Sequence, residues 1–352
     1  MAAASDTLGI GVIGAGLISA YHIAGIQAAG GATVRVLAAR TPARAGPLAR
    51  RFGVAEVATD WRAVLERVDV DAVVIATPDA VHREMALAAA EAGKALLLQK
   101  PMAMSAAECR EIIAAARAAR VDLQVSWMHR HFEEVVRAGE LLASGRLGPV
   151  HHLRIRNATS GPHEPWFFDR ALVAGGVVMQ LGVHGIDLVR HLFGATETVV
   201  ATTATVRPER AFPDGRRVSS ELEDEALATY QLSGGALASH EMSFNEAAGT
   251  DRFRLEIYCA EGTMLLRTQR GALAIHAPRV TGACGWFTPD LPARAFGARH
   301  HERWLDILRG KLPSDPTAED ALAGQLVAEA LYRSAASRRE EAVGALSEEV
   351  LQ

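Results

Sequence analysis

The residues on either side of Lys100 restrict its backbone and fix the position of its reactive amine. It follows the apolar run 95–98 and Gln99, and it precedes Pro101. The short run is apolar throughout, which predicts a strand buried on both faces, and the proline favours an extended backbone at Lys100. In open α/β sheets, ligands bind in the crevice beyond the carboxyl ends of the strands. Lys100 is therefore a candidate for ligand contact, and the competing interpretation is a lysine that reaches from a core strand to solvent.

His184 is a second candidate, in the mainly apolar segment 177–193 that predicts a helix. Gln180, His184 and Asp187 stand at positions i, i+4 and i+7, so they share one face of this helix. Polar side chains on an apolar helix need partners or a function. Histidine titrates near neutral pH, so it can take a proton from an alcohol or return it. The alternative is a core histidine that is hydrogen-bonded to Asp187.

A glycine pattern between the first strand and the first helix indicates dinucleotide binding. The apolar run 8–13 leads into the segment Gly14-Ala15-Gly16-Leu17-Ile18-Ser19. Gly14 permits a tight turn, and Gly16 lets the backbone approach a pyrophosphate. The small Ser19 suits close packing of the helix on the strand, and the helix N-terminus offers its dipole to the phosphates. We therefore expect cofactor contacts at Gly14, Gly16, Leu17 and Ile18.

The end of the second strand bears on the choice of cofactor. Dinucleotide-binding domains specific for NAD usually carry an acidic residue there, which binds the ribose 2′-hydroxyl group. This chain has Arg40 and Thr41 instead. Because an arginine can pair with a 2′-phosphate group, the sequence favours NADP(H) over NAD(H). The alternative is a solvated arginine beside a site that accepts NAD(H).

Strands alternate with helices through the first 127 residues, which predicts an α/β domain with a doubly wound parallel sheet of the Rossmann type. The expected strands are 8–13, 33–38, 71–76, 95–98 and 123–127, and Ser105 with Glu108 forms a capping box for a helix ending at 119. Thr77 and Gln99 then lie at carboxyl ends of strands, on the same edge as Gly14. These neighbours place Lys100 beside the predicted nicotinamide cofactor.

In the second half, residues 128–352, the apolar residues recur with a period of two after the predicted helix 177–193. Apolar Phe253, Leu255, Ile257 and Cys259 alternate with polar neighbours, which is typical of half-buried strands. We expect a strand at 150–158 and an antiparallel meander over 198–276. Helices are expected at 132–144, 177–193, 299–309 and 317–337. The sequence therefore predicts two domains, 1–127 for the cofactor and 128–352 for the substrate and for oligomer contacts.

Composition excludes several other classes of protein. The chain has 352 residues, 49% of them hydrophobic, and a net charge of −4 with both signs interspersed. It has no basic block, so nucleic acid is not an expected partner, and no apolar run is long enough to span a membrane. The first residues lack the pattern of a signal peptide, and the three cysteines are far apart, which is typical of a reducing compartment. We expect a cytoplasmic protein.

Paired histidines raise the alternative of a metal site. They are His129 with His131, and His151 with His152. Neither pair has a carboxylate at ligand spacing, and a predicted strand separates the two pairs. The sequence therefore predicts no metal.

These motifs together resemble the glucose–fructose oxidoreductase, inositol dehydrogenase and rhizopine catabolism (Gfo/Idh/MocA) family over nearly the whole chain. The resemblance rests on the residues already quoted and on the segments Thr77-Pro78-Asp79-Ala80-Val81-His82, Gly93-Lys94, Gly175-Gly176, Gln180-Leu181-Gly182-Val183-His184 and Ala330-Leu331-Tyr332-Arg333-Ser334. It implies a Rossmann domain followed by an α/β domain with a large, mainly antiparallel open sheet, whose free face commonly builds homodimers or homotetramers. The implied activity is reversible oxidation of a hydroxyl group on a sugar, an inositol or a relative.

The resemblance also implies roles for residues. Lys100 matches the family's lysine that contacts nicotinamide and substrate, and His184 matches the catalytic histidine. Pro78 and His82 join Thr77 in the cofactor motif. Two departures stand out, because Gln99 replaces the usual Glu and Gln180 replaces a frequent Asp. Both keep hydrogen-bonding capacity and lose charge.

The resulting hypothesis is hydride transfer between a nicotinamide cofactor and a sugar or polyol. His184, aided by Lys100, removes the hydroxyl proton during oxidation. Gln180 and Asp187 are expected near the substrate, together with candidate contacts at Arg130, His163 and Trp166. Two alternatives stay open. One is a glycosidase that oxidises its sugar transiently. The other is a nucleotide-bound sensor on the same fold, which Gln99 and Gln180 favour and the retained Lys100 and His184 disfavour.

Overall fold

The computed structural model describes residues 7–346 except 163, 247–252 and 268–270. The described residues form two compact units. The first contains the residues up to His131 together with Ala293–Leu322, and the second contains Phe132–Pro292 together with the residues after 322. These units differ from the predicted division after residue 127 in residues 128–131 and in the segment 293–322, both of which belong to the first unit.

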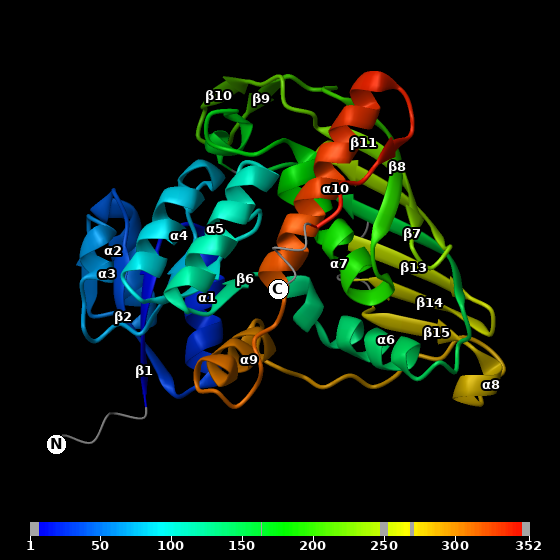
Figure 1. Ribbon diagram of the computed structural model, residues 1–352, viewed down its shortest axis with the longest axis horizontal. Coiled ribbons are helices and arrows are strands. Elements are labelled where there is room, and N and C mark those ends of the chain that lie inside the picture. Colours follow the sequence, from blue (N-terminus) through cyan, green and yellow to red (C-terminus); the bar gives the residue numbers. More distant parts are fainter. Residues whose placement is uncertain (1–6, 163, 247–252, 268–270, 347–352) are drawn as a thin grey trace. The chain divides into compact units, whose positions relative to one another are not determined.

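A six-stranded parallel sheet forms the centre of the first unit (Figure 1). Its strand order, β3-β2-β1-β4-β5-β6, is that of a Rossmann sheet. The predicted doubly wound sheet is therefore confirmed. The strands are β1 (Leu8–Ile13), β2 (Ala32–Ala38), β3 (Glu56–Ala58), β4 (Ala72–Ile75), β5 (Ala95–Leu98) and β6 (Leu123–Val125).

Six α-helices of the first unit pack around this sheet. They are α1 (Leu17–Ala29), α2 (Pro42–Phe52), α3 (Arg62–Leu65), α4 (His82–Glu91), α5 (Ala106–Ala119) and α9 (Ala298–Leu308). The Ser105 hydroxyl accepts the backbone N–H of Glu108 at the start of α5, which confirms the predicted cap. Helix α9 packs on α1. Trp304 and Leu305 of α9 join Ile23 and Ile26 of α1 in one buried cluster, and burial of such a side chain stabilises the fold by about 1.5–3 kcal/mol.

An eight-stranded, mainly antiparallel sheet forms the second unit, in the order β15-β14-β13-β7-β12-β11-β8-β16. Its strands are β7 (Val150–Ala158), β8 (Thr196–Ala204), β11 (Glu225–Leu232), β12 (Leu237–Ser243), β13 (Phe253–Cys259), β14 (Gly262–Arg267), β15 (Leu273–His276) and β16 (Glu341–Ala342). The predicted simple meander is wrong in one respect. Strand β7 lies between β12 and β13, parallel to β12, so backbone groups on both of its edges are paired.

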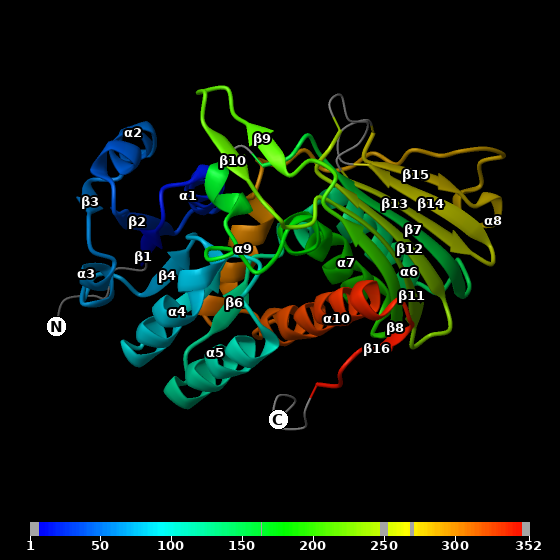
Figure 2. The same ribbon diagram turned by 90° about the horizontal axis from the view of Figure 1, so that it is seen from above.

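Helices cover one face of this sheet. Figure 2 shows α7 (Val183–Phe193) and the second half of α10 (Thr317–Ser337) on the same side of it. The unit also contains α6 (Glu133–Ala143), the short α8 (Pro278–Thr281) and the hairpin of β9 (Glu209–Ala211) with β10 (Arg217–Ser219). The uncovered face exposes Val200, Leu227 and Leu237.

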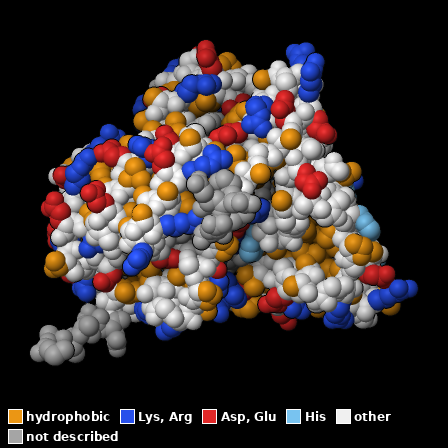
Figure 3. Space-filling model, in the orientation of Figure 1, with side chains coloured by type: hydrophobic (Ala, Val, Ile, Leu, Met, Phe, Trp, Pro, Cys, Tyr) orange, Lys and Arg blue, Asp and Glu red, His pale blue; other side chains and the backbone are white. Residues whose placement is uncertain are grey.

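The two signs of charge are mixed on the surface (Figure 3), as they are along the sequence. Basic and acidic side chains are interspersed on the face drawn in Figure 3. Among the described residues, no helix is both long enough and apolar enough to span a membrane.

Candidate functional site

The turn after β1 contains two glycines with different roles. The fold requires a glycine at position 14 but not at position 16. Gly14 has a φ of +115°, and a Cβ there would lie 2.1 Å from the carbonyl oxygen of Ala76. Gly16, by contrast, is the extended N-cap of α1, with a φ of −84°. Beyond its own neighbours in the chain, no described atom lies within 4 Å of a Cβ built on Gly16. The open space at this helix N-terminus fits the pyrophosphate of a dinucleotide.

The neighbouring residues complete the turn. Leu17 is 78% exposed in the first turn of α1, Ile18 is half-buried, and Ser19 is buried. An exposed leucine at a helix N-terminus offers an apolar contact to a bound ligand. The cofactor contacts at this turn stay a prediction, and the exposed Leu17 leaves room for them.

His82 joins the loops that follow β4 and β5. Its Nδ1 atom lies 3.0 Å from the carbonyl oxygen of Pro101, and its Nε2 atom lies 3.0 Å from the carbonyl oxygen of Thr77. The side chain is fully buried. Thr77 and the adjacent Pro78 are half-buried at the end of β4. His82 thus links the backbone of both loops at the edge of the sheet where the cofactor site is predicted.

Gln99 and Lys100 follow β5 at the same edge of the sheet. The backbone N–H of Gln99 donates to Ile75 at the end of β4. The side-chain oxygen of Gln99 accepts the N–H of Lys100 at 2.9 Å. Gln99 is buried and Lys100 is half-buried. The structure therefore brings Gly14, Thr77, Gln99 and Lys100 to the carboxyl ends of adjacent strands, as the sequence predicts.

Arg40 and Thr41 lie beyond the end of β2, and both are exposed. Thr41 is the N-cap of α2, and its carbonyl oxygen accepts the N–H of Arg44. Arg40 therefore stands at the position where an acidic residue would bind a ribose.

Arg130 has a partner inside the first unit. It lies in a 3₁₀ turn, Met128–His131, and is 7% exposed. Its guanidinium forms an ion pair of 2.9 Å with Asp320. Its predicted substrate contact remains a prediction, while the ion pair gives it a structural role.

In the second unit, the segment predicted as one helix is divided. Val178–Gly182 forms a π-helical turn, and α7 begins at Val183. Gln180 lies in the π turn, and His184 and Asp187 lie in α7, all three buried. The sequence pattern shows the polar stripe but not the π turn. Such turns occur frequently at functional sites.

Two glycines let this helix lie close to the sheet. A Cβ on Gly182 would lie 2.3 Å from the sulfur of Met242, and one on Gly185 would lie 2.6 Å from the Oδ1 atom of Asn157. These glycines flank His184, so close packing on β7 and β12 fixes the height of the histidine above the sheet.

Glu223, which the sequence does not single out, holds the start of the π turn. Its carboxylate accepts the N–H of Val178 at 3.2 Å and the hydroxyl of Tyr332 at 2.7 Å. A Cβ on Gly176 would lie 1.9 Å from the Glu223 carbonyl oxygen, and one on Gly175 would lie 2.2 Å from the Tyr332 hydroxyl. This packing explains the paired glycines and the tyrosine of the family motif. Burial raises the pKa of Glu223 despite the hydrogen bond from Tyr332.

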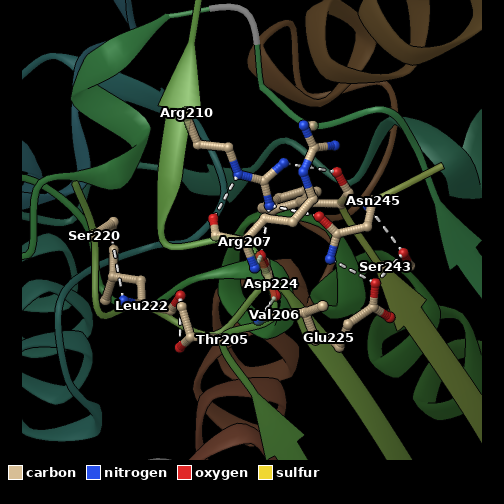
Figure 4. Close-up of polar contacts among 12 residues, drawn as sticks. Thr205, Val206, Arg207, Arg210, Ser220, Leu222, Asp224, Glu225, Ser243 and Asn245 are labelled. Atoms are coloured by element: carbon tan, nitrogen blue, oxygen red, sulfur yellow. Dashed lines mark hydrogen bonds and ion pairs between the residues drawn. The ribbon is translucent and has the colours of Figure 1, made fainter. Parts of the chain in front are cut away.

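The loop that carries Trp166 is anchored by its neighbour Phe168. Trp166 is half-buried in a 3₁₀ turn and stacks on Phe167. The hydroxyl of Ser220 donates to the Phe168 carbonyl, and the Arg210 guanidinium lies 5.5 Å from the Phe168 ring. Figure 4 shows how Arg210 is held, with hydrogen bonds to Asp224 at 2.6 Å and Asn245 at 2.7 Å. His163 lies outside the described residues.

The described residues offer no obvious metal centre. Among them, no group of three or more His, Cys, Asp or Glu side chains is arranged to hold a metal ion. His129 and His131 lie in the 3₁₀ turn of the first unit, whereas His151 and His152 lie on β7 of the second.

Comparison with known proteins finds relatives that match most of this chain. An inositol 2-dehydrogenase of Streptomyces avermitilis is 32% identical over 339 residues, which cover 94% of this chain and 92% of the relative. Levoglucosan dehydrogenase of Pseudarthrobacter phenanthrenivorans is 28% identical over 291 residues, 75% of each chain. A structure of levoglucosan dehydrogenase in complex with NADH and L-sorbose matches with a TM-score of 0.86 and 25% identity, over 96% of this chain and 99% of that one.

Two family models account for most of the chain. Residues 8–127 match the oxidoreductase family with an NAD-binding Rossmann fold, and residues 135–265 match the GFO/IDH/MocA C-terminal domain. The resemblance seen in the motifs is thereby confirmed. This protein belongs to the Gfo/Idh/MocA family of NAD-binding oxidoreductases.

Proposed function

We propose that the protein catalyses reversible hydride transfer between a nicotinamide cofactor and a CH–OH carbon of a sugar, an inositol or a related polyol or glycoside. The observation that carries the proposal is the edge of the parallel sheet, where Gly16 leaves room at a helix N-terminus and Lys100 follows β5. In the second unit, the buried His184 can transfer a proton, and the buried Gln180 and Asp187 stand beside it on the polar stripe. The names of the relatives support the class of substrate.

Each of the candidate residues has one role in the proposed chemistry. Gly14, Gly16 and Thr77 would hold a nicotinamide dinucleotide, whose bound nicotinamide would supply or accept the hydride. His184 takes the hydroxyl proton of the substrate as the alcohol becomes a carbonyl, and it returns the proton in reduction. Lys100 aids this proton transfer as a hydrogen-bond donor. Gln180 has no acidic proton in the relevant range, so it orients a substrate hydroxyl group.

A substrate panel tests the proposal. Purified protein is mixed with sugars, sugar acids, inositols, anhydrosugars or glycosides and with NAD⁺ or NADP⁺, and reduced cofactor is followed by absorbance. We expect turnover on at least one polyol or sugar. Lys100→Ala and His184→Ala should each lower kcat/KM by about 10²–10⁴-fold. Lys311→Ala and His151→Ala, at exposed residues, serve as matched controls.

Other outcomes distinguish the alternatives. Cleavage of a glycoside without net cofactor turnover would identify a glycosidase. Tight cofactor binding without turnover on the whole panel would identify a sensor. If both active-site variants kept kcat/KM within a few-fold of the unchanged protein, the assigned roles would be wrong.

For the cofactor, we propose a preference for NADP(H). Arg40 is exposed beyond β2, where a carboxylate would otherwise select NAD(H). The structural relative with NADH shows that the family scaffold accommodates the unphosphorylated cofactor, so both must be compared. A lower KM for NAD⁺ than for NADP⁺ would contradict the preference.

A further inference from the structure

A chain of buried hydrogen bonds runs from the backbone of Lys100 into the first unit. The N–H of Lys100 donates to Oε1 of Gln99 at 2.9 Å, and Nε2 of Gln99 lies 3.3 Å from Nε2 of His22. Nδ1 of His22 lies 2.9 Å from Nε2 of His301. Nδ1 of His301 lies 2.8 Å from the carbonyl oxygen of Gly297. The chain thus links the loop after β5 to α1 and α9.

The two ends of the chain determine the position of every hydrogen. A backbone N–H can only donate, so the oxygen of Gln99 faces Lys100 and its NH₂ group faces His22. A carbonyl oxygen can only accept, so His301 carries its hydrogen on Nδ1 and accepts on Nε2. His22 must then carry its hydrogen on Nδ1 and accept on Nε2. Each contact has one donor and one acceptor, and every member is neutral.

Burial keeps both imidazoles neutral. His22 and His301 are each 0% exposed. Loss of hydration lowers the pKa of His22 well below its ordinary value, and the proximity of His301 lowers it further. Burial lowers the pKa of His301 to about 4.

The side chains that pack against His22 and His301 are themselves neutral. Tyr21 of α1 and His300 of α9 pack against it, and His131 of the 3₁₀ turn stacks on His300. Burial also lowers the pKa of His300, and that of His131 falls to about 3. Arg130, Arg303 and Asp315 are the charged groups that act on His131.

We infer that His22 and His301 are positioning residues for Lys100, and that their tautomers select an amide at position 99. The role of Lys100 rests on the proposed function. A carboxylate at position 99 would only accept, so Nε2 of His22 would need a hydrogen. Reversal of the chain would then leave Nδ1 of His301 without a hydrogen against the Gly297 carbonyl. The remaining solution is a buried imidazolium, which the neutral amide avoids.

A measurement without turnover tests the chain directly. Two-dimensional ¹H–¹⁵N spectra of the full-length protein report which ring nitrogen of each histidine carries a hydrogen. At pH 7 we expect both His22 and His301 as Nδ1–H tautomers, with the signals of the exposed His151 as an internal comparison. In Gln99→Glu, His22 should become an imidazolium, with a hydrogen on both ring nitrogens, at pH values below its new pKa. A hydrogen on Nε2 of His22 in the unchanged protein would overturn the inference.

A pH profile tests the effect on Lys100. Gln99→Glu should add a pKa to the kcat profile between about pH 5 and 8, because His22 then titrates beside a carboxylate. Above that pKa, kcat should fall by about tenfold. Gln124→Glu is the matched control, since Gln124 is another buried glutamine of the same unit, bonded to Ser314 and Thr317. Identical profiles for the two variants would overturn the positioning role. Absence of turnover in every protein would reject the proposed function. The tautomers of His22 and His301 would still show whether the hydrogen bonds run as inferred.

Discussion

The Nδ1 atom of His82 lies 3.0 Å from the carbonyl oxygen of Pro101. Its other nitrogen contacts the Thr77 carbonyl, so one side chain ties the loop after β4 to the loop that carries Lys100. We expect His82→Ala to lower the free energy of unfolding by about 1–3 kcal/mol through unsatisfied backbone groups. It should also lower kcat more than it raises the KM for cofactor. Urea unfolding and steady-state kinetics, with His151→Ala as control, measure both effects. An unchanged kcat would show that the link does not position the site.

Gly14 and Gly16 should respond differently to the same substitution. Gly14→Ala creates a clash with Ala76 and adopts a φ that alanine disfavours, so it should destabilise the fold. The methyl group of Gly16→Ala meets no described atom beyond the adjoining residues, so this variant should leave the melting temperature nearly unchanged. It should nevertheless weaken cofactor binding by about tenfold or more, since the methyl group occupies the space for the pyrophosphate. Cofactor titration by fluorescence provides the measurement. Wild-type affinity in Gly16→Ala would place the dinucleotide elsewhere.

Arg40→Ala separates the two cofactors. Loss of a charge-assisted contact with a 2′-phosphate should raise the KM for NADP⁺ by about tenfold, while the KM for NAD⁺ stays within about twofold. Arg50→Ala, at another exposed arginine nearby on α2, is the control for net charge. An equal change for both cofactors would remove Arg40 from the ribose site.

Glu223 gives stability a pH dependence of defined sign. Burial raises its pKa above the ordinary 4.5, so the folded protein holds this proton more tightly than the unfolded chain does. Its contribution to stability is therefore fully present below about pH 4.5 and is lost as pH rises through the raised value. Glu223→Gln retains an acceptor for Tyr332 and removes this titration. Denaturant unfolding should show the variant gaining stability relative to the unchanged protein between pH 5 and pH 8. A constant difference would contradict the raised pKa.

The uncovered face of the eight-stranded sheet is the expected oligomer contact. Val200, Leu227 and Leu237 are 46%, 61% and 55% exposed on it. Leu227→Asp should convert a dimer or tetramer to a species near the chain mass of 37.5 kDa, because a buried unpaired charge opposes association. Light scattering after size-exclusion chromatography measures the mass. Val68→Asp, at a fully exposed valine of the first unit, should leave it unchanged.

Local patterns in the sequence account for most of the elements and for the choice of candidate residues. The alternation of strands and helices up to residue 127 determines the parallel sheet, because each strand is too apolar to remain uncovered. The glycine turn, the strand before Lys100 and the polar stripe around His184 are likewise features of adjacent residues. The helix 317–337 even has the predicted bounds.

Only the tertiary structure decides which distant residues share an environment. The insertion of β7 between β12 and β13, the Glu223–Tyr332 contact and the pairing of His22 with His301 join segments far apart in the chain. Nothing in local periodicity encodes such pairs, since side-chain partners and tautomers depend on packing between elements. Gln99 shows the difference most clearly. In the sequence, Gln99 is an unexplained departure from a family motif. In the fold, its neutral amide donates a hydrogen bond to the buried His22.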